Sequence, residues 1–318
     1  MSLRPFYIFA TVLAFLFFAS CKGGGKQPAA AEGREFPKVK VPAVYTEEAE
    51  LKDYIVDHYW DSFLALDGPI DSALILGVPK GEVEQAFANW LAIMDNLPLE
   101  DAQGWMSKLF RQTEAKHRAD TSSRFYLVFS EIVSRYLYDP NSPLRDEDLY
   151  LPFVRGLAAS PCTREDYRRA FIHEAQMCAM NPRGSIAPDF RITRADGRQF
   201  RLHQVPARYI ILFFSNPGCH ACQDIINDIM TIPDINVRIE RHEIAVVNVY
   251  IDEDIESWLG YESHYPRNWF SGYDAAGIIR ADLLYNVRAI PSLYLLDSQK
   301  HIILKDAPIA RVKAWMTD

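Results

Sequence analysis

The feature of this sequence that most constrains its fold is a pair of cysteines directly after a short apolar run. The run is Tyr209–Phe214, and apolar runs of about 4–8 residues are typical of strands buried on both faces of a sheet. The sequence Asn216-Pro217-Gly218-Cys219-His220-Ala221-Cys222 follows, and apolar residues with helical spacing continue to about Thr231. We therefore predict a buried strand, a turn, and a helix whose first turn carries both cysteines.

The position of this cysteine pair predicts dithiol chemistry. A cysteine at a helix start lies near free backbone N–H groups and the positive end of the helix dipole, and both favour its thiolate. We therefore expect Cys219 to be the nucleophile. Cys222, one turn further along, is expected to be more buried and to resolve a mixed disulfide by attacking Cys219.

Other roles of the pair fit the sequence less well. Covalent haem attachment requires a histidine directly after the second cysteine, where this chain has Gln223. A zinc site requires about four ligands, and neither a second cysteine pair nor spaced histidines follow. A permanent structural disulfide stays open as an alternative. We expect no metal and no cofactor.

His220 lies between the two cysteines and has two interpretations. A protonated imidazole there would tune the pKa of Cys219 by stabilising its thiolate. Alternatively, His220 is an exposed spacer whose type only adjusts the reduction potential. The sequence leaves both open.

The residues around the pair, 187–318, alternate between strand and helix patterns. This order predicts an α/β fold in which helices flank a mixed central sheet. A hairpin is expected around Asp196-Gly197. Further strands are expected at 245–251, 292–296 and 301–304, and further helices at 275–285 and 309–316.

Residues 45–182 have a different pattern and predict an all-α bundle of about six helices. The clearest segment is 125–137, where apolar residues recur at helical spacing. One helix is expected to begin at Ser142-Pro143, because serine is a good N-cap and proline suits the first helical position. Another is expected to begin at Thr163, which has an acidic residue three positions later, as in a capping box.

Several residues that suggest a function have structural explanations. At 1.5 Å per residue, Cys162 and Cys178 would lie about 24 Å apart along one helix, well beyond the roughly 7 Å limit for a disulfide. We expect both to be small buried residues and not redox partners. The aromatic run 57–63 is expected to pack in the core, with a partner-docking face as the alternative, and Trp258 and Trp269 are expected to pack as well.

Residues 1–20 predict a signal peptide. Their apolar run, Phe6 to Phe18, is shorter than the roughly 20 residues that span a bilayer. The run ends at Ala19-Ser20-Cys21, which resembles a bacterial lipobox and implies a lipid anchor on Cys21. An ordinary cleaved signal is the alternative. Residues 21–44 are rich in Gly, Lys, Pro and Ala and predict a flexible tether, so we expect a membrane-anchored protein of the cell envelope that faces the periplasm.

The charge of the chain argues against one class of partner. The formal net charge is −8 at pH 7 and no long basic run occurs. Nucleic-acid-binding proteins have basic patches that neutralise phosphates. We therefore expect no nucleic acid partner.

A second motif, Ile290-Pro291, comes before a predicted strand. Together with 216–222 it resembles the thioredoxin superfamily, and most of all the membrane-tethered bacterial thiol–disulfide oxidoreductases related to proteins of cytochrome c maturation. The sequences Ala187-Pro188-Asp189-Phe190 and Asp196-Gly197 fit that subgroup. The helical half is similar to an uncharacterised domain that precedes thioredoxin domains in some bacterial lipoproteins.

The resemblance implies a cis Ile290–Pro291 bond, a proline lying against the sulfurs, and an Ile290 backbone that pairs with an incoming peptide strand. A trans proline that merely opens an edge strand is the alternative. Two departures stand out. Gly218 replaces the usual tryptophan before the first cysteine, and Phe213 replaces the buried acid that many thioredoxins place on the preceding strand.

We expect a thiol–disulfide oxidoreductase that acts on protein disulfides or thiols, in the reducing direction that the resemblance implies. A membrane thiol protein would then supply electrons. The alternatives are a disulfide oxidase or isomerase, and a non-catalytic envelope binding module that uses the helical half.

Overall fold

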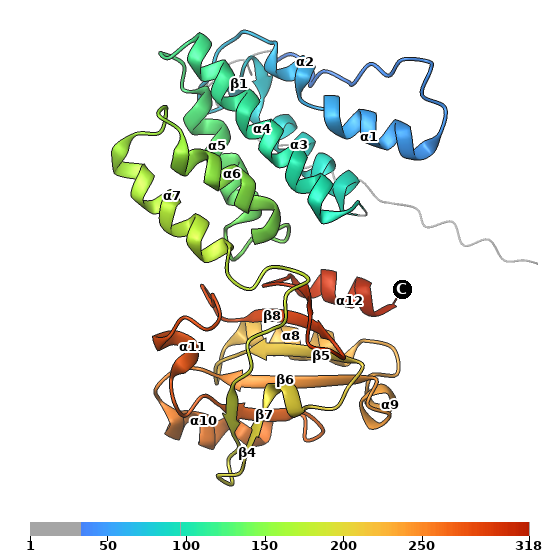
Figure 1. The fold of residues 1–318 in the computed structure, drawn as a ribbon, viewed down its shortest axis with the longest axis vertical. Helices are drawn as coiled ribbons and strands as arrows, with labels where there is room; N and C mark the ends of the chain where they lie inside the picture. Colours follow the sequence, from blue (N-terminus) through green and yellow to red (C-terminus); the bar gives the residue numbers. More distant parts are fainter. Residues whose placement is uncertain (1–32, 96, 318) are drawn as a thin grey trace, which may run out of the picture. The chain divides into compact units, whose positions relative to one another are not determined.

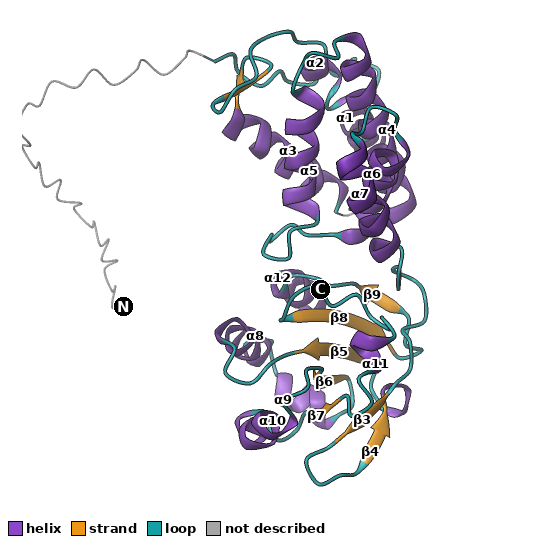
Figure 2. Cartoon of the chain, turned by 90° about the vertical axis from the view of Figure 1, so that its left-hand side faces the viewer, coloured by secondary structure: helices purple, strands orange, loops and turns teal. Residues whose placement is uncertain are grey.

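The computed structural model describes residues 33–95 and 97–317 of the chain (Figure 1). Helices make up most of its N-terminal part, and strands with flanking helices make up the C-terminal part (Figure 2). We call residues 48–178 the helical region and residues 187–317 the sheet region. A mixed sheet follows a helical region, as the sequence predicts.

The helical region contains seven helices among its described residues, and its core is unusually rich in aromatic side chains. Trp60 and Phe63, from the aromatic run 57–63, are 2% and 0% exposed, so their predicted packing in the core is confirmed. The helices are α1 (Glu48–His58), α2 (Asp61–Leu64), α3 (Lys80–Met94), α4 (Leu99–Ala119), α5 (Phe125–Leu137), α6 (Glu147–Ala159) and α7 (Glu165–Cys178).

A short hairpin interrupts the helices and was not predicted. Its strands, β1 (Leu74–Ile75) and β2 (Val78–Pro79), have two residues each. Strands of this length have no measurable alternation of apolar and polar residues, so the pattern could not reveal them.

Two predicted helix starts were wrong. Helix α6 begins at Glu147, where the Asp146 side chain accepts a hydrogen bond from Leu149 N, and not at Ser142. The Ser142 hydroxyl instead donates to the Tyr136 carbonyl at 2.6 Å. The Thr163 hydroxyl lies 2.8 Å from the Tyr126 hydroxyl, and α7 begins at Glu165 without a side-chain cap.

The sheet region has seven strands in the order β4-β3-β7-β6-β5-β8-β9. The β5–β6 and β6–β7 pairs are parallel, whereas the β5–β8, β8–β9, β3–β4 and β3–β7 pairs are antiparallel. The strands are β3 (Arg191–Thr193), β4 (Gln199–Arg201), β5 (Tyr209–Phe214), β6 (Ile244–Tyr250), β7 (Phe270–Tyr273), β8 (Ser292–Asp297) and β9 (Ile302–Leu304).

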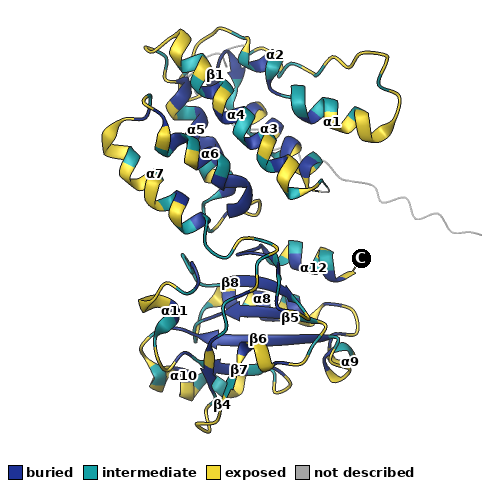
Figure 3. Ribbon diagram, in the orientation of Figure 1, coloured by how far each residue is buried: buried dark blue, intermediate teal, exposed yellow. Residues whose placement is uncertain are grey.

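Apolar side chains cover both faces of this sheet, and the central strands are buried throughout (Figure 3). One face packs against α8 (His220–Met230), α9 (Ile235–Glu240), α10 (Ile255–Tyr261) and α12 (Ile309–Thr317). The other face packs against α11 (Ile278–Ala281) and the segment before β3. Burial on both faces is the reason that β5 and β6 are apolar without alternation.

The prediction of a long helix at 275–285 was wrong, because only the four residues of α11 are helical. Leu283 has a φ of 49°, which a continuing right-handed helix does not allow. Strand β7 was missed because it includes Ser271 and Gly272, which look like a turn. A Cβ atom at Gly272 would lie 2.5 Å from Ile192 Cγ2, so the close approach of β3 requires glycine there.

Candidate active site at the start of helix α8

The two cysteines lie at the start of α8, as the sequence predicts. Cys219 is the N-cap residue, and its Sγ accepts a hydrogen bond of 3.2 Å from the backbone N–H of Cys222. Gly218 has a φ of 68°, which glycine adopts without strain and which turns the chain from β5 into α8. Both cysteines are free thiols in this structure. An N–H donor aimed at a sulfur favours negative charge on that sulfur.

Cys222 is the more buried of the two. Its side chain belongs to the core between the sheet and α8, and the residue is 2% exposed. Burial, together with the hydrogen bond to Cys219, raises the pKa of Cys222 to about 12, although the backbone N–H of Asn216 acts in the opposite direction. Cys222 therefore keeps its proton at neutral pH, whereas the partly exposed Cys219 is accessible to other molecules.

His220 is the first residue of α8 and is exposed. Its side chain takes part in none of the side-chain hydrogen bonds or ion pairs found among residues 33–95 and 97–317. The structure therefore shows an exposed side chain between the cysteines. A role in tuning Cys219 stays a prediction.

The Ile290–Pro291 peptide bond is cis, and this prediction is confirmed. The bond lies directly before β8, the antiparallel neighbour of β5. Ile290 is partly buried and packs against the clusters on both faces of the sheet. The loop that contains Pro291 therefore leads into β8. Strand β8 lies beside β5, the strand that leads to the cysteines.

A polar contact beside the cysteine motif was missed in the sequence. Asn216 Nδ2 donates to Asp252 Oδ2 at 2.6 Å, and Asp252 pairs with Arg280 at 2.6 Å. A usable signal existed, because β5 and β6 are parallel and the residues after their carboxyl ends must lie at one edge of the sheet.

Polar side chains also lie beside Phe213, which is fully buried. In the register of the sheet Phe213 pairs with Asn248 on β6, and Asn248 pairs with Ser271 on β7. The Ser215 hydroxyl donates to Asn248 Oδ1 at 2.5 Å and lies 3.3 Å from the Tyr265 hydroxyl. The row that lacks an acid on β5 therefore carries neutral polar groups on β6 and on β7, the strand beyond it.

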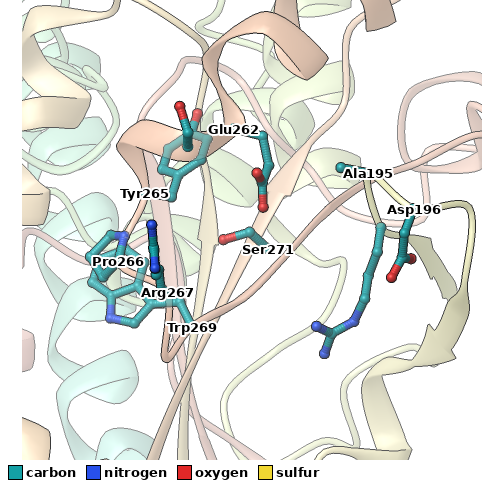
Figure 4. A pocket seen from close by; sticks show the side chains of 10 residues that line it. Ala195, Asp196, Glu262, Tyr265, Pro266, Arg267, Trp269 and Ser271 are labelled. Atoms are coloured by element: carbon teal, nitrogen blue, oxygen red, sulfur yellow. The ribbon is translucent and has the colours of Figure 1, made fainter.

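A pocket of about 410 Å³ lies elsewhere in the sheet region (Figure 4). Ala195 and Asp196 of the β3–β4 turn line one part of it, and residues 262–271 line another. Neither cysteine lines this pocket.

The remaining predicted residues have separate positions. Cys162 and Cys178 are free thiols, so the expectation that they do not pair agrees with the structure. Trp258 and Trp269 are 0% and 4% exposed, which confirms their packing in the core.

Cys21 lies outside the described residues, as do residues 1–20. No helix among residues 33–95 and 97–317 is both long and apolar enough to cross a membrane.

Comparison with known proteins agrees with this geometry. A crystal structure of a thioredoxin-like protein from Bacteroides caccae superposes with a TM-score of 0.73 at 30% sequence identity. The match covers 89% of this chain and 98% of that protein. This chain belongs to the thioredoxin-like family. The resemblance of the two motifs to the thioredoxin superfamily is thereby confirmed.

Residues 20–178 of this thioredoxin-like protein match the family described as Domain of unknown function (DUF5106). This match covers half of the chain, which therefore belongs to that family too. It includes the helical region and ends at Cys178, the last residue of α7. The description of the family assigns no activity to the helices.

Two further matches concern only part of the chain. The C-terminal domain of an uncharacterized protein from Bacteroides fragilis is 37% identical over 43% of this chain and 99% of its own length, with a TM-score of 0.42. A protein from Arabidopsis thaliana named probable nucleoredoxin 1 is 29% identical over 119 residues. Our chain spans only 20% of that plant protein's length.

Proposed function

We propose that this protein is a thiol–disulfide oxidoreductase that acts on protein disulfides in the cell envelope. The observation that carries the proposal is the combination of a partly exposed Cys219 at a helix start with a buried Cys222 one turn away. The cis Ile290–Pro291 bond before the strand next to β5 supports it.

In the proposed reaction, the Cys219 thiolate attacks one sulfur of a substrate disulfide. A mixed disulfide forms, and the first substrate thiolate leaves and takes a proton from water. The Cys222 thiol then loses its proton, attacks Cys219 and forms the Cys219–Cys222 disulfide, and the second substrate thiol is released. Two electrons pass from the protein to the substrate.

The binding of the substrate is assigned to the loop before β8. An extended polypeptide would pair with the backbone of Ile290 beside Pro291, as a neighbouring strand does in a sheet. Backbone pairing recognises any extended chain. Folded or partly folded proteins with accessible disulfides are therefore the expected substrate class.

Reduction is the direction that we propose. A reductase must itself be reduced again, so a membrane protein that delivers thiol electrons is the implied partner. The location rests on the signal-like residues 1–20 and on Cys21 as the lipid anchor, with the tether 21–44 between the anchor and the fold.

The reduction potential of the Cys219–Cys222 pair tests the direction. It is measured by titrating the protein against a thiol buffer at equilibrium. A value near about −270 mV, as in thioredoxin, supports a reductase, whereas a value near about −120 mV indicates a strong oxidant. The second value would overturn the reducing direction and favour disulfide formation.

Trapping tests the substrate class. Cys222→Ser removes the resolving thiol, so a mixed disulfide between Cys219 and a substrate persists. Proteins that are bound to this variant and released by a reductant are the substrates. The double variant that also carries Cys219→Ser is the control, and equal recovery with both variants would count against the proposal.

A further inference from the structure

A group of buried charges lies next to the cis peptide bond. Glu147, the first residue of α6, is 2% exposed. Its carboxylate forms ion pairs of 2.8 Å with Arg288 Nε and of 2.8 Å with Lys305 Nζ. It also accepts a hydrogen bond of 3.0 Å from Asn286 Nδ2. We call Glu147, Arg288, Lys305 and Asp306 the Glu147 cluster.

Asp306 connects the two sides of the cis peptide bond. Its Oδ2 pairs at 3.1 Å with Arg288, two residues before Ile290. Its Oδ1 accepts a hydrogen bond of 2.7 Å from the hydroxyl of Ser292, directly after Pro291. One carboxylate thus holds both ends of the loop 288–292.

The helical region supplies the other contacts of Arg288. Its guanidinium donates to the Tyr138 carbonyl, and its Cζ lies 4.1 Å from the centre of the Tyr138 ring. Arg145 Nε, also from the helical region, donates to the carbonyl of Asp306 at 2.8 Å. Arg288 and Asp306, which hold the loop, are therefore themselves held by α6 and the residues just before it.

The energetics favour a single position of this loop. A buried charge without a partner is strongly unfavourable, and breaking a buried pair costs more than the pair contributes. Arg288 and Lys305 share one carboxylate, Glu147. Movement of the loop away from α6 would separate Arg288 from Glu147, so the loop stays where the helical region places it.

We propose that the helical region positions the 288–292 loop through the Glu147 cluster and thereby sets the affinity of the site for extended polypeptides. This inference rests on the proposed function. Glu147 and Arg288 act as positioning residues. A substrate strand pairs with Ile290 only if the loop lies at strand spacing, about 4.8 Å. The thiols at the start of α8 do not depend on that spacing.

The test compares two substrates with the full chain. The first is 5,5′-dithiobis(2-nitrobenzoate), a small aromatic disulfide that needs only the dithiol. The second is a fluorescence-quenched synthetic disulfide between two extended peptides. Each protein is first reduced and separated from the reductant, so KM and kcat here are the half-saturating substrate concentration and the maximal rate of a single turnover. For Glu147→Gln, which keeps the shape and removes the charge, we expect KM for the peptide to rise about 10-fold with kcat unchanged. The rate with the small disulfide should stay within about twofold of that of the natural protein.

The matched control is Asp95→Asn. It removes the 2.8 Å ion pair between Asp95 and Arg311, which also links the two regions but touches no part of the loop. Both substrates should react with this variant as with the natural protein. If Glu147→Gln slows both substrates equally, or neither, positioning by the helical region is wrong.

If Glu147→Gln fails to fold, a second variant still tests the inference. Arg288→Lys keeps the charge but cannot contact Glu147, Asp306 and the Tyr138 carbonyl at once. We expect the same rise in KM for the peptide alone, and an unchanged KM would overturn the inference. A natural protein that fails to react even with the small disulfide would contradict the proposed function instead, so the two failures are distinguishable.

Discussion

Helices α7 and α8 each have two nearby cysteines, and the two pairs differ in where their cysteines lie along the helix. Cys162 comes before α7 and Cys178 is its last residue, so a whole helix separates them. Cys219 and Cys222 share the first turn of α8. Burial raises the pKa of the Cys178 thiol well above its usual range. By contrast, the Cys219 sulfur is partly exposed and accepts a backbone N–H.

This difference in placement on a helix is the physical basis on which we propose the α8 pair, and not the α7 pair, as the reactive one. The start of a helix has unpaired N–H groups, and its end has unpaired carbonyls. An N–H group stabilises a thiolate, whereas a carbonyl repels it. A pair one turn apart can form a disulfide, and a pair that brackets a helix cannot.

The two regions differ in their cores as well. The core of the helical region is an aromatic cluster, in which the Trp60 and Phe129 rings are 5.3 Å apart. The sheet region buries mostly aliphatic side chains on both faces of its strands. The buried acidic residues described in the helical region, Asp146, Glu147 and Asp148, are consecutive, and Glu147 pairs with Arg288 before β8.

The largest expected effect is the loss of Cys219. Cys219→Ser should abolish reduction of both small and protein disulfides, because a hydroxyl at neutral pH is a poor nucleophile toward sulfur. Release of 2-nitro-5-thiobenzoate from the small aromatic disulfide measures this. Cys178→Ser is the control. Activity that survived Cys219→Ser but was lost in Cys178→Ser would mean that Cys178, and not Cys219, is the reactive cysteine.

A large effect on stability is expected in the helical core. Phe129 is fully buried in α5 and stacks on Phe125 at 5.1 Å. Phe129→Ala should lower the free energy of unfolding by about 3–5 kcal/mol, because it removes buried apolar surface and leaves a cavity. Denaturant unfolding followed by circular dichroism measures this.

The control for that variant lies in the same helix. Leu127 is 40% exposed, so Leu127→Ala should change the free energy of unfolding by less than about 0.5 kcal/mol. The molecules of Phe129→Ala that stay folded should keep their dithiol chemistry. A loss of reaction with the small disulfide in folded Phe129→Ala would mean that the helical core affects the dithiol chemistry itself.

A moderate effect concerns pH. Because burial raises the pKa of Cys222 to about 12, the thiolate fraction below that pH rises about 10-fold per pH unit. The release of substrate from the mixed disulfide should therefore accelerate about 10-fold per pH unit between about pH 6 and 9. Stopped-flow measurement of the second thiol released from the small disulfide gives this rate.

Two outcomes sharpen this prediction. Cys222→Ser should eliminate the second release at every pH, which assigns the phase to Cys222. A second phase independent of pH would mean that a nearby group takes the proton.

The smallest effect is expected at Cys162. This residue is half-buried, and its backbone N–H donates to Ser160 Oγ at 3.0 Å. Cys162→Ser should leave both the activity and the midpoint of unfolding nearly unchanged, within about 0.5 kcal/mol of stability. A clear loss of disulfide reduction in this variant would show that the helical region contributes a thiol to the reaction.

Much of the candidate site could be predicted from the sequence, because its parts are local. The strand β5, the glycine turn, the start of α8 and both cysteines lie within residues 209–222. Elements that follow one another along the chain here are also neighbours in the fold. The cis Ile290–Pro291 bond came from resemblance to a family, since spacing alone does not set the isomer of a proline bond.

The sequence by itself determined the α/β order of the sheet region, the helical character of the first region and the dithiol at a helix start. Only the tertiary structure revealed that Asp252 holds Asn216, that Asn248 lies beside Phe213, and that Glu147 pairs with Arg288. The physical reason is distance along the chain. Local periodicity reports which face of an element is buried, but a buried charge or amide is satisfied by whichever remote partner the packing brings to it.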